Sequence, residues 1–129
     1  MIWLQLLTAL LNVLNARLQK PFLRKRIDNG STKWQTFVFH VISWISRAAV
    51  VAGLSFLHPS AVPYWLCFVA LGLVSYLVFD IAIGYFVWKD PWFLGTTANA
   101  DVFVKNGRVK AIVLGIIIIV VNIYLWQNR

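Results

Sequence analysis

Three long stretches with almost no charge constrain the fold of this chain more than any other feature. They are residues 34–57, 64–88 and 109–126, and each holds one charged residue: Arg47, Asp80 and Lys110 respectively. As helices they reach roughly 27 to 36 Å, and the hydrocarbon core of a bilayer is about 30 Å thick. A lone strand in lipid leaves its backbone polar groups unsatisfied. Each stretch is therefore predicted to be a membrane-spanning helix.

The composition agrees with a membrane environment. Hydrophobic residues make up 60% of the chain and charged residues 12%, against about 45–50% and about 25% in soluble domains. We predict an all-α fold, a polytopic bundle of three or four transmembrane helices in a single integral membrane domain over residues 1–129. The expected helices cover about 1–19, 34–57, 63–88 and 109–126. A proline-rich turn at residues 58–63 joins the second and third.

The first segment, residues 1–19, has two interpretations. Its polar residues recur every three or four positions and so form one uncharged stripe on a helix: Gln5, Thr8, Asn12, Asn15 and Gln19. The segment either spans the membrane with the stripe against neighbouring helices, which we favour, or lies in the interface with the stripe among the headgroups. No basic residue precedes its apolar run, so we expect the segment to be retained and not to be a cleaved signal peptide.

The distribution of charge predicts the orientation. The chain has 12 Lys and Arg against 4 Asp and Glu. Residues 17–33 form a predicted loop with a basic cluster suited to anionic lipid headgroups: Arg17, Lys20, Arg24, Lys25, Arg26 and Lys33. Because cytoplasmic loops collect Lys and Arg, this loop and residues 89–110 are expected in the cytoplasm, with a bacterial inner membrane the expected location. No motif indicates nucleic acid binding.

Ionisable side chains inside a bilayer are the best functional candidates in this sequence, because each costs about 2.5–3.5 kcal/mol to insert. The second and third spans form a hairpin, which places His40 at the depth of Asp80. Arg47 lies seven residues after His40 and so on the same face of the helix. We predict a buried polar cluster of His40, Ser43, Arg47, Tyr76, Asp80 and Asn122. The cluster either fixes helix register, forms a proton or ion path, or meets its copies across an oligomer.

Other parts of the sequence carry less chemistry. Residues 90–108 are expected to form a segment on the inner surface with a short amphipathic helix. Cys67 is the lone cysteine and is expected to be a small buried hydrophobe. The sequence has no metal-ligand cluster, phosphate loop or nucleophile elbow. We therefore expect that the chain binds no metal or cofactor and is not an enzyme.

Residues 80–84, the run 92–97 (Trp-Phe-Leu-Gly-Thr-Thr) and Asp101 resemble small uncharacterised multi-span membrane proteins of phage and mobile elements. The resemblance implies a holin-like protein, meaning one that oligomerises into membrane lesions. We expect the chain to act through helix association, as a homo-oligomer or a subunit of a membrane complex. The alternative is a pore, channel or proton-conducting protein that uses the intramembrane His, Arg and Asp residues.

Overall fold

The computed structural model of the chain describes residues 1–30, 32–92 and 106–127, without the side chains of residues 26, 27, 33 and 36. Within these residues the fold is all-helical. Its elements are α1 (Ile2–Asn29), α2 (Lys33–Ser55), α3 (Tyr64–Ile83), the π-helix η1 (Gly84–Trp88) and α5 (Gly107–Gln127). The predicted inner-surface helix falls mostly on residues 93–105, which lie outside the described part.

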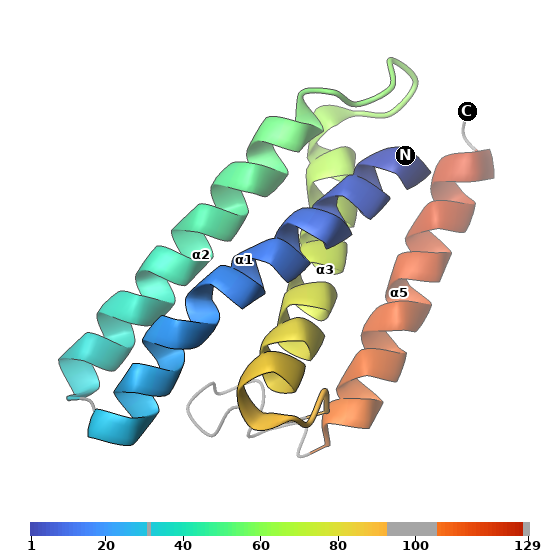
Figure 1. Ribbon diagram of the computed structural model, residues 1–129. Coiled ribbons are helices and arrows are strands. Elements are labelled where there is room, and N and C mark those ends of the chain that lie inside the picture. The colour runs from blue at the N-terminus through green and yellow to red at the C-terminus, as the bar shows by residue number, and fades with distance from the viewer. Residues whose placement is uncertain (31, 93–105, 128–129) are drawn as a thin grey trace.

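Helix α3 is the centre of the bundle. It contacts α1, α2 and α5, whereas the backbone of α5 comes close only to that of α3 among the described helices. In Figure 1, α1 crosses α3 diagonally, α2 runs antiparallel beside α1, and α5 stands on the other side of α3. The N-terminus, the turn between α2 and α3, and the end of α5 lie at one end of the molecule. The ends of α1 and η1 and the starts of α2 and α5 lie at the other.

The three predicted spans are confirmed as helices long and apolar enough to cross a membrane. In the described part they cover Phe37–Ser55, Tyr64–Trp88 and Gly107–Gln127, within a few residues of the predicted bounds. Helix α1 is not among them, because its polar stripe and basic second half lower its hydropathy. The fourth predicted helix therefore exists, but its composition alone does not mark it as a span.

The predicted loop over residues 17–33 is wrong. Helix α1 continues to Asn29 through Pro21, and Gly30, with φ of 70°, follows its end. A proline inside a helix removes one backbone hydrogen bond and usually bends or breaks it. Here α1 packs on α3 and η1 on both sides of Pro21 in sequence, and the helix continues through the proline. The connection to α2 shrinks to residues 30–32, and Thr32 caps α2 through a reciprocal pair of bonds with Gln35.

Polarity in α1 is reversed relative to a water-soluble helix. Its buried residues are Thr8, Asn12 and Ala16, while Trp3 is 82% exposed and Leu18 72% exposed. On α5 only Leu125 is buried, although the helix is apolar on nearly every side. Water would make both arrangements unfavourable, whereas lipid tails make them favourable. The fold is thus built for a hydrocarbon solvent.

The end of α3 requires glycine. A Cβ at Gly84 would lie 2.6 Å from the carbonyl oxygen of Asp90, and one at Gly107 would overlap the Trp92 carbonyl. The backbone amides of Lys89 and Asp90 both bond to the Gly84 carbonyl, with Lys89 in the left-handed conformation at φ of 60°. These close approaches turn the chain sharply after η1 and bring the start of α5 beside α3.

Candidate intramembrane polar site

Arg47 is a buried cation near the middle of its span. Its side chain is 7% exposed, and its Nε donates a hydrogen bond to the Ser43 carbonyl oxygen at 3.1 Å. The guanidinium carbon lies 4.6 Å from the centre of the Trp44 ring and 4.2 Å from that of Phe79. Aromatic faces attract cations, so the two rings partly replace the water that the guanidinium has lost.

Asp80 and Lys110 form an ion pair between α3 and α5. The Lys110 Nζ donates to Asp80 Oδ2 at 2.6 Å, with side-chain exposures of 10% and 33%. The same ammonium lies 4.6 Å from the centre of the Tyr76 ring. This pair ties the start of α5 to the second half of α3.

Aromatic stacking joins the two charged groups. The Trp44 and Tyr76 rings stack with their centres 6.0 Å apart, and each lies against one of the two cations. We call this set the intramembrane cluster: Trp44, Arg47, Tyr76, Phe79, Asp80 and Lys110. The cluster holds two cations, Arg47 and Lys110, and one carboxylate, that of Asp80, so its formal net charge is positive.

This arrangement has two chemical capacities. It fixes the relative depth of α2, α3 and α5, because sliding any of them would separate charges in a low-dielectric medium. It also holds a carboxylate whose protonation would remove the counter-charge of two cations. Both capacities depend on Asp80.

The structure places the predicted cluster residues differently from one another. Arg47, Tyr76 and Asp80 all belong to the intramembrane cluster, and Ser43 is buried and contributes its backbone carbonyl. His40 is exposed and lies beside the Phe39 ring, so its predicted burial is wrong. The Asn122 amide donates to the Ile118 carbonyl of its own helix, not to another helix.

The misplacement of His40 has a geometric cause. The depth argument assumed that α2 and α3 pack along their full length as a hairpin. Instead α1 crosses α3 and also contacts α2, and in Figure 1 the first half of α2 lies beside α1 while its second half approaches α3. Trp44 and Arg47 therefore reach α3, whereas His40 faces outward.

The polar stripe of α1 packs against α3. Thr8 and Asn12 are fully buried, Asn12 Nδ2 donates to the Thr8 carbonyl, and the Ser75 hydroxyl donates to Asn12 Oδ1. Further along, Gln19 Nε2 donates to Asn15 Oδ1 at 2.8 Å. Helix α3 thus covers part of the stripe, while α1 is not among the three described helices apolar enough to span a membrane. Within the described residues, Gln5 Nε2 and Gln19 Oε1 are buried without a hydrogen-bond partner.

The basic cluster on α1 is largely exposed. Arg17, Arg24 and Lys25 are exposed and Lys20 is half-buried, while the side chains of Arg26 and Lys33 lie outside the described part. Arg24 also has a structural role, because its Nη2 donates to the Val87 carbonyl at 3.2 Å. That bond ties the second half of α1 to η1.

Sequence reasoning missed Lys110, Trp44, Phe79 and Ser75 as site residues. From the sequence, Lys110 is only the single charge of its apolar stretch, yet its place near the start of that stretch is a usable signal for a partner of Asp80. Lys110 and Asp80 also border a small open pocket between α3 and α5. Its other walls come from Leu77, Ile81, Pro91, Trp92, Gly107, Ala111 and Leu114.

Comparison with known proteins gives no match to a protein-family model, a curated protein or a solved structure. The class of protein therefore follows from the helices and their side chains alone. Three long apolar helices with many exposed apolar side chains fit a small α-helical membrane protein.

Proposed function

We propose that this membrane protein acts through helix association within the bilayer, as a homo-oligomer or a subunit of a membrane complex. Support comes from one flank of α2. Ala49 and Gly53 lie four residues apart and are exposed, and nothing lies within 4 Å of where a Gly53 Cβ would be. Ile42 and Ile45 continue the same exposed flank. Small residues at this spacing let two membrane helices approach closely.

Labelled chains reconstituted in liposomes test self-association by energy transfer at increasing dilution in lipid. We expect transfer in the wild type and its loss in Gly53→Leu, because a large side chain separates the helices. Gly115→Leu on α5 is the matched control, since that glycine also has open space beside it. If the chain stays monomeric at high density, the homo-oligomeric form is wrong. Loss of transfer in the α5 variant alone would move the interface to α5.

The alternative function is a holin-like pore or a proton path. Its proposed lining, the stripe of α1, is packed against α3, which leaves Asp80 as the titratable group for conduction. Proton flux into liposomes that is lost in Asp80→Asn but kept in Gly53→Leu would favour conduction over association.

We also propose that the basic end of the bundle faces the bacterial cytoplasm. The support is the asymmetry of charge, since the described turn at the opposite end, residues 56–63, holds no Lys, Arg, Asp or Glu. In a Cys67→Ala background, a cysteine at Lys25 should resist an impermeant thiol reagent in intact cells, and one at Ser60 should react. The reverse pattern would invert the topology.

A further inference from the structure

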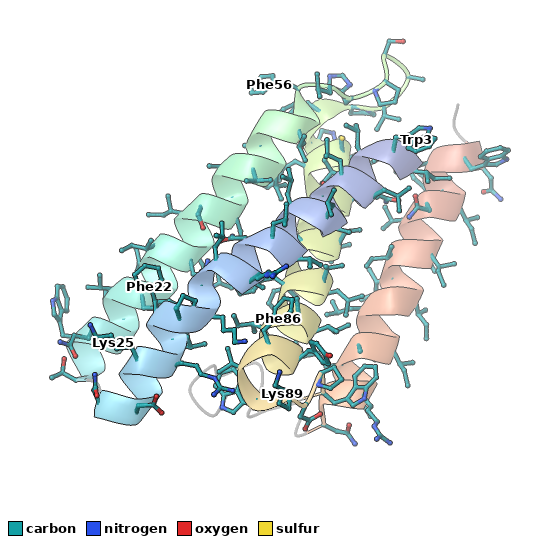
Figure 2. All side chains as sticks on the ribbon, in the orientation of Figure 1. Trp3, Phe22, Lys25, Phe56, Phe86 and Lys89 are labelled. Atoms are coloured by element: carbon teal, nitrogen blue, oxygen red, sulfur yellow. The ribbon has the colours of Figure 1, made fainter. Side chains whose placement is uncertain are left out.

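Basic side chains from three segments gather at one end of the molecule. They come from α1, from the residue after η1, and from the start of α5. The residues, which we call the basic rim, are Lys20, Arg24, Lys25, Lys89 and Arg108. Figure 2 shows Lys25 and Lys89 at the end opposite Trp3 and Phe56. Only Asp28 and Asp90 provide exposed acids among the described residues, so the rim is strongly positive.

One contact joins two segments of the rim, and a second positions Lys89. Arg24 donates to the Val87 carbonyl and so joins α1 to η1. The Lys89 ammonium lies 5.5 Å from the centre of the Tyr85 ring on η1, while both side chains stay exposed. Cations from segments more than sixty positions apart in sequence are thus held on one surface.

Exposed aromatic side chains accompany the rim. Phe22 is 68% exposed, Trp34 70% and Tyr85 54%, and each belongs to a segment at this end. Aromatic rings beside cations, next to helices that expose apolar side chains, match the chemistry of the headgroup layer. A bound nucleic acid would contact the cations but would leave these aromatic rings, and the exposed apolar side chains of the neighbouring helices, in water.

We propose that the basic rim binds anionic phospholipid headgroups of the leaflet at this end. The inference does not rest on helix association, since each chain carries a whole rim. The rim includes Lys89 and Arg108, which the cluster on α1 alone does not contain. Arg47 and Lys110 are excluded from it, because the intramembrane cluster already holds both. The phosphate diester and any added headgroup charge are the groups that the rim would contact.

The test uses the full chain in bilayers that mix phosphatidylcholine and phosphatidylglycerol, one of them brominated. Bromine quenches tryptophan, so the two labelling schemes report which lipid is enriched around the protein. We expect enrichment of phosphatidylglycerol in the wild type. The variant K20Q/K25Q/K89Q should lose most of it, because each cation near an anionic surface contributes about fivefold in affinity. The variant K20R/K25R/K89R keeps the charge and should keep the enrichment.

Equal quenching by both lipids in the wild type, or unchanged enrichment in the glutamine variant, would overturn the proposal. Displacement of phosphatidylglycerol by inorganic phosphate at constant ionic strength would assign the rim to a soluble anion and also overturn it. Salt provides a measurement that needs no variant, because screening weakens exposed charge interactions. Enrichment that does not fall from low to high salt would count against headgroup binding even if the glutamine variant failed to fold.

Discussion

The Ser75 hydroxyl on α3 donates a hydrogen bond of 2.9 Å to Oδ1 of Asn12 on α1, and both side chains are buried. Asn12 in turn donates to the Thr8 carbonyl of its own helix. This short chain of bonds explains how a helix with polar groups on one side can sit among lipid tails. It makes α1 dependent on α3 for more than packing.

The energy of this contact can be measured. We expect Asn12→Ala and Ser75→Ala each to lower the free energy of unfolding. Their coupling in a double-mutant cycle should be about 0.6 kcal/mol and at most about 1.7 kcal/mol, the range seen for bonds between membrane helices. Unfolding in mixed micelles with increasing SDS provides the measurement. Strictly additive losses would mean that the hydrogen bond contributes nothing.

Removing the carboxylate of the intramembrane cluster should be costly. Asp80→Asn leaves Lys110 and Arg47 without a counter-charge, and we expect a loss of about 2–3 kcal/mol. That is below the cost of breaking a fully buried pair, because a third of the Asp80 side chain is exposed. Asp90→Asn is the matched control, since it is exposed and the amide oxygen can still accept from the Trp92 amide. Equal losses for the two variants would contradict the role given to Asp80.

At Arg47, methionine should be tolerated better than lysine, although lysine is chemically more similar to arginine. Arg47→Met removes the second cation and leaves the Asp80–Lys110 pair balanced, so we expect a change within about 1 kcal/mol. Arg47→Lys keeps the charge but loses the planar group between the Trp44 and Phe79 rings, at a cost of about 1–2 kcal/mol. The same unfolding measurement compares them. A lysine variant more stable than the methionine variant would show that charge, and not stacking, governs this position.

Alanine substitutions at four glycines distinguish positions that lack room for a side chain from positions where glycine only lowers helix propensity. Gly84→Ala and Gly107→Ala place a methyl group against backbone carbonyls, so both should destabilise the turn after α3. Gly72→Ala and Gly115→Ala have open space and should gain up to about 1 kcal/mol, because alanine favours helix. Thermal unfolding in micelles gives the order. Four similar results would argue against the close approaches at the end of α3.

The sequence predicted the spans well because charge and length decide them locally. Residues 64–88 emerged as one stretch, and the structure makes them α3 and η1 without a break. The extension of α1 past Pro21 was not predictable in the same way. A proline and a dense basic cluster usually indicate a loop, and only the packing of α1 on α3 and η1 changes that balance.

The candidate site was predictable only in part. Arg47 and Asp80 were found because any charge in a long apolar stretch is conspicuous. Their partners depend on crossing angles, which no periodicity in this sequence encodes. Helices α2 and α3 meet through Trp44 and Tyr76, which leaves His40 exposed, and Lys110 supplies the counter-charge of Asp80.

The burial of Thr8 and Asn12 against α3 has a consequence for how the chain is assembled. The ribosome makes α1 first, and Ser75 follows 63 residues later. Until α3 arrives, Oδ1 of Asn12 lacks its donor Ser75, although the Thr8 hydroxyl and the Asn12 amide already bond to carbonyls of α1. We expect the nascent α1 to wait at the surface of the membrane and to sink into it only when α3 is in place.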